Sequence, residues 1–141
     1  MDLSRISVLI IDDDSWITRL LVKIFDRLEM RNIFVANNAF DGIAMVFTKK
    51  PNIIFLDIMM PDLNGLQVLK LLKSIPDTQN IPVLMISGNT DYANVGTAIS
   101  QGACGFVSKP FTFEIIKEKM EKIIQNNVLK VSNEYDSEFD V

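Results

Sequence analysis

The chain has 141 residues, of which 48% are apolar, and this size and composition are typical of one globular domain with a buried core. Its 14 basic and 18 acidic residues give a net charge of −4 without a cluster of lysine or arginine, which argues against direct nucleic-acid binding. The sequence contains no histidine, which excludes serine–histidine–aspartate triads, cysteine–histidine pairs and histidine-based zinc sites within this chain.

The first half of the chain predicts two strand–helix pairs. The apolar run Ser7–Ile11 predicts a strand, and Asp14 or Ser15 is placed to cap the helix that follows. The apolar face of this first helix consists of Ile17, Leu20, Leu21, Ile24, Phe25 and Leu28. A second strand, at about Asn32–Ala36, leads to a helix that Pro51 ends. The apolar face of this second helix consists of Phe40, Ile43, Ala44 and Phe47.

The second half predicts three more pairs. The strands are residues 52–56, 82–86 and 105–108, and the helices are about residues 66–75, 92–101 and 113–126. Pro76 stops the first of these helices. The helix at 92–101 has only a thin apolar stripe, made of Val95, Ala98 and Ile99, so we expect it to be weakly anchored.

Five alternations of strand and helix predict an α/β fold with right-handed crossovers, in which a doubly wound parallel sheet forms the middle of a three-layer sandwich. The expected strand order is 2-1-3-4-5, as in flavodoxin-like folds, with five helices. After residue 127 no period is sustained, and the segment carries Glu134, Asp136, Glu138 and Asp140. We therefore expect one domain at residues 1–127 and a flexible acidic tail at residues 128–141.

The sequence also carries expectations about location. Cys104 is the single cysteine and cannot form an internal disulfide, and the N-terminus does not have the pattern of a signal peptide. No apolar run approaches the ~20 residues that span a bilayer. We expect a soluble protein of the reducing cytoplasm that does not contact a membrane.

Five polar side chains follow or end the apolar runs: Asp12, Asp13, Asp57, Ser87 and Lys109. In a parallel sheet these groups emerge together at the carboxyl edge, where α/β folds place their chemistry. The sequence therefore predicts one site assembled from four distant segments.

Consecutive acids, Asp12, Asp13 and Asp14, stand where many α/β proteins have a glycine-rich phosphate-binding loop. Such a cluster attracts a hard cation, Mg²⁺ or Mn²⁺, with Asp13 and Asp57 as direct ligands and Asp12 acting through water. A backbone carbonyl near Met59 completes the predicted set.

A carboxylate beside Mg²⁺ can attack a phosphoryl group and form an acyl phosphate, so Asp57 is the candidate nucleophile. Lys109 offers the neutralising cation and Ser87 a hydroxyl donor. Helix capping and a solvated turn remain an alternative for the three consecutive acids.

Four motifs, in order and at characteristic spacing, make nearly the whole chain up to Asn126 resemble the receiver domain of two-component response regulators, the family of the single-domain chemotaxis regulators. They are Val8-Leu9-Ile10-Ile11-Asp12-Asp13-Asp14, Phe55-Leu56-Asp57-Ile58-Met59-Met60-Pro61-Asp62-Leu63-Asn64-Gly65, Pro82-Val83-Leu84-Met85-Ile86-Ser87-Gly88, and Gly105-Phe106-Val107-Ser108-Lys109-Pro110-Phe111.

The resemblance implies a role for each site residue. Asp57 is the phosphoacceptor, Asp12 and Asp13 are the acidic metal-binding pair, Ser87 is the switch hydroxyl and Lys109 is the phosphate-binding cation. It also implies a cis peptide bond between Lys109 and Pro110.

The resemblance further implies a signalling switch rather than an enzyme. The phosphoryl group comes from a histidine kinase or a histidine phosphotransfer protein. Ser87 and Phe106 then reshape a surface on the fourth helix, fifth strand and fifth helix for a downstream target protein. Because Phe106 stands where the family often has tyrosine, its switching rests on packing; a simple core aromatic is the alternative. The chain is expected to be a monomer or a phosphorylation-dependent dimer.

Met59 and Asn89 occupy positions that the family uses to tune phosphoryl lifetime. Met59 has no polar atom to orient a hydrolytic water, which predicts slow to moderate dephosphorylation. Trp16, the single tryptophan, follows the acidic turn and is a candidate fluorescent reporter of Mg²⁺.

Three rival interpretations stay open. In the first, the chain is a receiver fragment of a larger regulator with a DNA-binding or enzymatic output domain. In the second it is a Mg²⁺-dependent aspartyl phosphatase, and in the third it is an FMN carrier. The phosphatase needs a second acid two residues after the nucleophile, where Met59 stands. The FMN carrier needs hydroxyl or glycine donors where the three consecutive acids stand.

Overall fold

The structure, a computed structural model, describes residues 2–88 and 92–139, with backbone alone for Tyr92 and residues 128–139. The described residues up to Phe111 form one compact unit and those from Thr112 form a second, and each is treated by itself. Among these residues, no helix combines the length and the apolar character that crossing a membrane requires.

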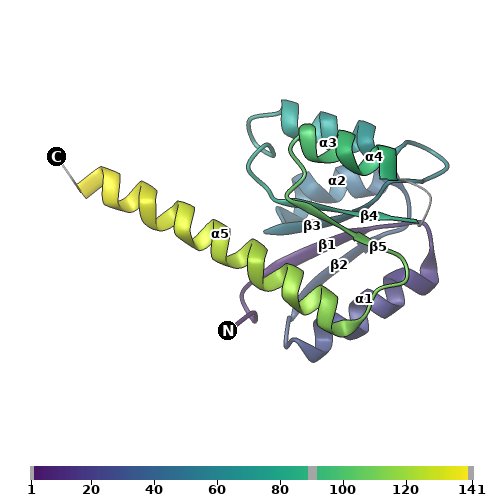
Figure 1. Ribbon diagram of the computed structural model, residues 1–141, viewed down its shortest axis with the longest axis horizontal. Helices are drawn as coiled ribbons and strands as arrows, with labels where there is room; N and C mark the ends of the chain where they lie inside the picture. The colour runs from purple at the N-terminus through teal and green to yellow at the C-terminus, as the bar shows by residue number, and fades with distance from the viewer. Residues whose placement is uncertain (1, 89–91, 140–141) are drawn as a thin grey trace. The chain divides into compact units, whose positions relative to one another are not determined.

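Five short strands form one parallel sheet (Figure 1). They are β1 (Ser7–Ile11), β2 (Asn32–Ala36), β3 (Ile53–Asp57), β4 (Val83–Ser87) and β5 (Gly105–Ser108). Their order is β2-β1-β3-β4-β5, which confirms the predicted order. Every residue of β3 and β4 is buried, as expected for central strands covered on both faces.

Five helices alternate with the strands. They are α1 (Ser15–Arg27), α2 (Ala39–Lys49), α3 (Gly65–Ser74), α4 (Tyr92–Ser100) and α5 (Phe113–Phe139). Within the first unit, α2, α3 and α4 lie on one side of the sheet and α1 lies on the other (Figure 1). The predicted layers of helix, sheet and helix are therefore present.

Alternation along each strand distributes the core between the two faces. On the face of α2, α3 and α4, Ile11 and Leu56 pack with Leu69 in one apolar cluster. On the face of α1, Phe25 meets Phe55 edge to face, with ring centroids 5.1 Å apart. This packing fixes the ends of β1 and β3, from which the site is built.

Local caps fix where the helices beside the site begin. Asp14 caps α1, because its carboxylate accepts hydrogen bonds from the backbone N–H groups of Trp16 and Ile17 at 2.9 and 3.4 Å. Asn64 and Gln67 form a reciprocal capping box at the start of α3. Of the two predicted caps for the first helix, the structure therefore selects Asp14.

The predicted apolar face of α2 is wrong. Phe40 and Phe47 are 64% and 42% exposed, and the helix buries Ala39, Gly42 and Val46 instead. A Cβ atom at Gly42 would lie 2.7 Å from Ile11 side-chain atoms, so the helix approaches the sheet more closely than a larger residue allows. Small residues make this contact, and the phenylalanines turn outward.

Two smaller expectations also need correction. Ile99 was placed on the apolar stripe of α4, but it is 47% exposed, and Val95 and Ala98 alone of that stripe are buried. The fifth helix does not end near Asn126, because α5 continues to Phe139. The segment after residue 127 contains no proline or glycine to stop a helix. The domain boundary at residue 127 and the separate tail stay predictions.

Candidate functional site

The carboxyl edge of the sheet brings acidic side chains together. Asp12 directly follows β1, and Asp57 is the last residue of the neighbouring β3. Both are buried, with exposed fractions of 0% and 4%, whereas Asp13 is exposed. One carboxylate oxygen from each of the three lies within 4.8 Å of the others, so this cluster is able to hold a metal ion.

Lys109, which follows β5, brings a positive charge to the two buried acids. Its Nζ lies 3.2 Å from Oδ2 of Asp12 and 3.4 Å from Oδ1 of Asp57. The backbone N–H of Lys109 donates to the carbonyl oxygen of Ser87 at 2.8 Å. The peptide bond between Lys109 and Pro110 is cis, which confirms that expectation. Segments from three strands thus converge on one ammonium group.

Burial and charge shift the pKa values of this cluster. Burial, and then the adjacent charge of Asp12, raise the pKa of Asp57 to about 7, although Lys109 opposes the shift. Burial lowers the pKa of Lys109, but the carboxylates of Asp57 and Asp12 outweigh burial and leave that pKa raised. Lys109 therefore stays charged, and one ammonium only partly compensates two buried acids.

One carboxylate oxygen at the centre of the cluster accepts no well-aligned hydrogen bond from the described residues. Oδ1 of Asp12 accepts a hydrogen bond from the backbone N–H of Asp14 at 2.9 Å. Oδ2 is buried and receives no well-aligned hydrogen bond from the described residues, although Lys109 Nζ lies nearby. A buried anionic oxygen in this state is costly, and a hard cation is the partner that suits it.

Ser87 and Phe106 lie on the other half of the same edge. Ser87 is the last residue of β4, is 2% exposed, and stands one position beyond Ile86, which pairs with Asp57. Phe106 on β5 is half-buried and packs against the apolar cluster beneath α2, α3 and α4. These positions agree with the predicted roles, and the roles themselves stay proposals.

The remaining predicted residues differ in how fully they are described. Met59 is 59% exposed in the loop after β3, and Trp16 is 69% exposed in the first turn of α1. Asn89 lies outside the described residues.

Sequence reasoning missed two residues that shape the loop after Asp57. The carboxylate of Asp62 accepts hydrogen bonds from the backbone N–H groups of Ala39 and Phe40, both at 3.2 Å, and thereby joins this loop to α2. A Cβ atom at Gly65 would overlap the carbonyl oxygen of Asp57. The capping pattern from Asn64 to Gln67 could have placed the start of α3, but no local pattern reveals the partners of Asp62.

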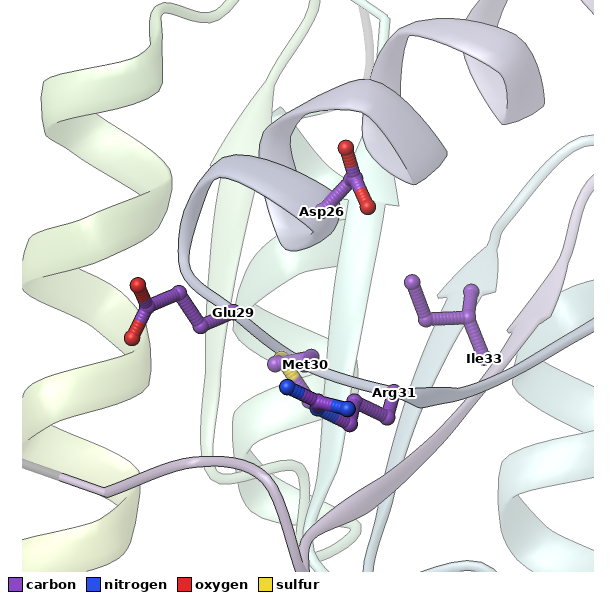
Figure 2. Close-up of a pocket in the computed structure, with 5 residues that line it drawn as sticks. All are labelled: Asp26, Glu29, Met30, Arg31 and Ile33. Carbon is purple, nitrogen blue, oxygen red and sulfur yellow. The ribbon is translucent and has the colours of Figure 1, made fainter.

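A pocket lies away from this cluster, near the amino end of β2 (Figure 2). Its side chains come from the end of α1, the loop that follows it and β2. They are Asp26, Glu29, Met30, Arg31 and Ile33. None of the predicted site residues lines this pocket.

Comparison with known protein families gives one match that covers most of the chain. The model of the response regulator receiver domain matches residues 8–121. The chemotaxis protein CheY1 of Helicobacter pylori is 28% identical over 121 residues, which cover 85% of this chain and 98% of that protein. The chemotaxis protein CheY of Pseudomonas aeruginosa is 28% identical over 118 residues, covering 84% and 95%.

Solved structures give the same result. The signal receiver domain of a DNA-binding response regulator from Colwellia psychrerythraea matches with a TM-score of 0.79 and 30% identity, covering 85% of this chain and 98% of that one. NtrX from Brucella abortus matches with a TM-score of 0.84 and 28% identity, covering 91% of this chain but 28% of NtrX. The matched architecture thus occurs in short receiver chains and in one part of a longer chain.

Proposed function

The chain belongs to the response regulator receiver domain family, and we propose that it accepts a phosphoryl group on Asp57 in a two-component phosphorelay. One observation carries the proposal: the buried carboxylate of Asp57 shares an acidic cluster with Asp12 and Asp13 and lies 3.4 Å from the ammonium group of Lys109. This arrangement provides a nucleophile, a candidate cation site and a fixed positive charge.

We propose Mg²⁺ as the cofactor, with Mn²⁺ as a substitute. Asp13 and Asp57 would be direct ligands, Asp12 would act through water, and the backbone carbonyl of Met59 would complete the set. The buried Oδ2 of Asp12, which accepts no well-aligned hydrogen bond from the described residues, and the all-oxygen chemistry of the cluster fit a hard cation. When bound, such a cation supplies positive charge to the oxygens of the phosphoryl group.

The proposed reaction moves one phosphoryl group between proteins. A carboxylate oxygen of Asp57 attacks the phosphorus of a partner's phosphohistidine, so an O–P bond forms while the N–P bond breaks and the imidazole leaves. Because these 141 residues contain no histidine, the donor side chain must lie outside this sequence. Lys109 balances the charge of the transferred group, and the Ser87 hydroxyl donates to one of its oxygens.

The same site explains why Asp57 needs positive charge around it. Burial raises its pKa to about 7, so in the metal-free protein the carboxyl group is only partly ionised at neutral pH. Attack requires the ionised form. Lys109 favours that form, and additional positive charge beside Asp12 and Asp57 would favour it further.

We place the output of the switch on α4 and β5. Ser87 and Phe106 lie on neighbouring strands. The predicted movement of Ser87 toward the phosphoryl group and the predicted inward rotation of Phe106 would alter this part of the surface. α4 buries little apolar surface within the described part of the chain, which suits an element that changes position. The predicted participation of the fifth helix rests on the family resemblance.

The proposed partners are a histidine kinase or histidine phosphotransfer protein as donor and a downstream protein as target, all in the cytoplasm. The chain spans 98% of the Helicobacter pylori relative but 28% of NtrX. We favour a signalling switch over an aspartyl phosphatase because Met59 stands where the phosphatase requires its second acid.

The test is incubation with Mg²⁺ and acetyl phosphate, followed by intact mass. The wild type should gain one phosphoryl group, and Asp57→Asn should gain none. Asp26→Asn makes the same chemical change at the opposite edge of the sheet and should behave as wild type. Equal phosphorylation of the wild type and Asp57→Asn would refute the assignment.

A further inference from the structure

The loop between β3 and α3, residues 58–64, carries one member of the proposed ligand set, the backbone carbonyl of Met59. The loop has two polar side chains, Asp62 and Asn64, and they serve different helices. Asn64 caps α3, which continues the same segment of chain. Asp62 instead reaches the first turn of α2, which precedes it by more than 20 positions. Asp62 therefore fastens the loop to a distant part of the chain.

The first turn of α2 divides its backbone donors between a local and a distant acceptor. Asn38, the N-cap residue, accepts a hydrogen bond from the backbone N–H of Asp41 at 2.8 Å. The N–H groups of Ala39 and Phe40 donate to Oδ1 and Oδ2 of Asp62, both at 3.2 Å. Because the first N–H groups of a helix have no partner within it, a carboxylate at this place is favourable. Both oxygens of Asp62 are thus engaged.

The carboxyl group of Asp62 is ionised in this contact. Desolvation raises its pKa, but the hydrogen bonds from the backbone N–H groups of Ala39 and Phe40 outweigh desolvation and leave the pKa below its usual value. A charged acceptor makes stronger hydrogen bonds than a neutral one. We call these two hydrogen bonds the Asp62 clamp.

The clamp connects the two strands that carry the buried acids. Gly42 of α2 lies directly against the side chain of Ile11, so the start of the helix is fixed relative to the end of β1. Ile11 is the residue before Asp12. Through Asp62, the same helix also holds the loop that follows Asp57. α2 therefore links the segment with the first buried acid to the segment with the second.

We propose that Asp62 is a positioning residue for the metal site, whose clamp on α2 holds the loop where the backbone carbonyl of Met59 binds the cation. This inference rests on the proposed function, because it requires that a cation binds the acidic cluster. Since both oxygens of Asp62 accept hydrogen bonds from α2, Asp62 acts through the loop and not as a ligand. Residues that orient metal ligands in this way contribute to metal affinity.

Titration of the unphosphorylated full chain with MgCl₂, followed by the backbone amide NMR signals of residues 12–14, tests the proposal. Asp62→Ala removes both hydrogen bonds and should weaken Mg²⁺ binding about tenfold or more relative to the wild type. Asp62→Asn keeps one acceptor oxygen, so its affinity should lie between those of Asp62→Ala and the wild type. Both variants lack the negative charge, so a purely electrostatic effect would weaken binding equally in the two.

Phosphorylation by acetyl phosphate provides a second readout. If Asp62 acts through the metal site, Asp62→Ala should be phosphorylated slowly at low Mg²⁺ concentration and at close to the wild-type rate once Mg²⁺ is saturating. A slow rate that saturating Mg²⁺ leaves unchanged would contradict a role in positioning the metal site.

Asn38→Ala is the matched control. It removes the local cap from the same helix start but leaves the Asp62 clamp in place. Asn38→Ala should therefore lower the urea midpoint of unfolding, as Asp62→Ala does, while it binds Mg²⁺ as tightly as the wild type. The control separates the position of the loop from the stability of α2.

The outcomes also separate this inference from the proposed function. Equal Mg²⁺ affinity of the wild type and Asp62→Ala, equal losses in the two Asp62 variants, or an equal loss in Asn38→Ala would each overturn the positioning role and leave Asp57 as the proposed phosphoacceptor. A wild type that binds no Mg²⁺ would overturn the proposed metal site and this inference with it.

Discussion

Two consecutive strand–helix units carry parts of the proposed site, and they are anchored very differently. β3 ends in the buried acid Asp57, and the helix after it starts with a capping box and buries Gly65, Val68, Leu69 and Leu72. β4 ends in the buried hydroxyl of Ser87, and among the described side chains of the helix after it only Val95 and Ala98 are buried. The two strands are equally buried, so the difference lies in the helices and in the polar groups that precede them.

The difference suits two separate tasks, which are to hold Asp57 in a fixed position and to change the position of α4. A buried carboxylate is costly, and attack requires it in a fixed position, so the firmly packed α3 and its loop suit the acceptor. A buried neutral hydroxyl carries a smaller cost, and the lightly anchored α4 changes position with less loss of packing. We therefore expect the β3–α3 unit to be the rigid side of the proposed switch and the β4–α4 unit to be the side that moves.

The largest expected effect concerns the charge at the end of β3. Because the pKa of Asp57 is about 7 in the folded chain and 3.8 ordinarily, the folded state retains a proton that the unfolded state releases. Stability of the metal-free protein should therefore fall as pH rises from about 4 to about 7, by at most on the order of 4 kcal/mol. Urea unfolding at several pH values measures this.

Substitutions at the two strand ends isolate that effect. Asp57→Asn should remove this contribution to the free energy of unfolding. The stability of the variant relative to the wild type should therefore increase between pH 4 and pH 7. Ser87→Ala should retain the wild-type dependence on pH. Equal slopes for the wild type and Asp57→Asn would show that burial of this carboxyl group does not govern acid stability.

The next effect compares apolar anchors of the two helices. Leu72→Ala on α3 should lower the free energy of unfolding by about 3 kcal/mol, because it deletes a side chain with no exposed surface. Ile99→Ala on α4 should change it by less than about 1 kcal/mol. Chemical denaturation at fixed pH measures both, and similar losses would break the contrast between the helices.

Gly65 tests how closely α3 must approach Asp57. Gly65→Ala introduces a Cβ atom that would overlap the carbonyl oxygen of Asp57, so the loop or the helix must shift. We expect a loss of about 2 kcal/mol and slower phosphorylation by acetyl phosphate. Thermal unfolding and phosphorylation kinetics measure the two effects, and a variant that matches the wild type in both would contradict the tight fit.

Gly96, in α4, predicts the smallest effect and the opposite sign. A Cβ atom there meets no described atom within 4 Å, and alanine favours helix more than glycine does. Gly96→Ala should therefore raise the free energy of unfolding by about 0.5 to 1 kcal/mol, again measured by denaturation. A loss of stability would indicate that α4 is packed more tightly than its exposed residues suggest.

The sequence allowed the strands and the site cluster to be predicted because both depend on local signals. Each central strand is a short apolar run, and each run ends at a polar residue, so the positions of Asp57 and Ser87 followed from the parallel topology. The place of Lys109 at the same edge followed from the same reasoning, whereas its contacts with Asp12 and Asp57 were not predicted.

Other features depend on distances that no local pattern contains. The predicted buried face of α2 was wrong because the close approach of Gly42 to Ile11 determines which side of the helix faces the sheet. An amphipathic pattern favours the larger residues instead. The hydrogen bonds of Asp62 join residues 22 and 23 positions apart and leave no sequence signature. The length of α5 was underestimated because its last part lacks apolar periodicity, although it also lacks a helix breaker.

The most direct test of the central claim locates the phosphoryl group on the chain. After incubation with Mg²⁺ and acetyl phosphate, borohydride reduces an aspartyl phosphate to homoserine, and peptide mass spectrometry then identifies the converted residue. The account predicts homoserine at position 57 and at no other aspartate. Conversion of Asp12 or Asp13 instead, or of no residue in a protein that has gained phosphate, would contradict it.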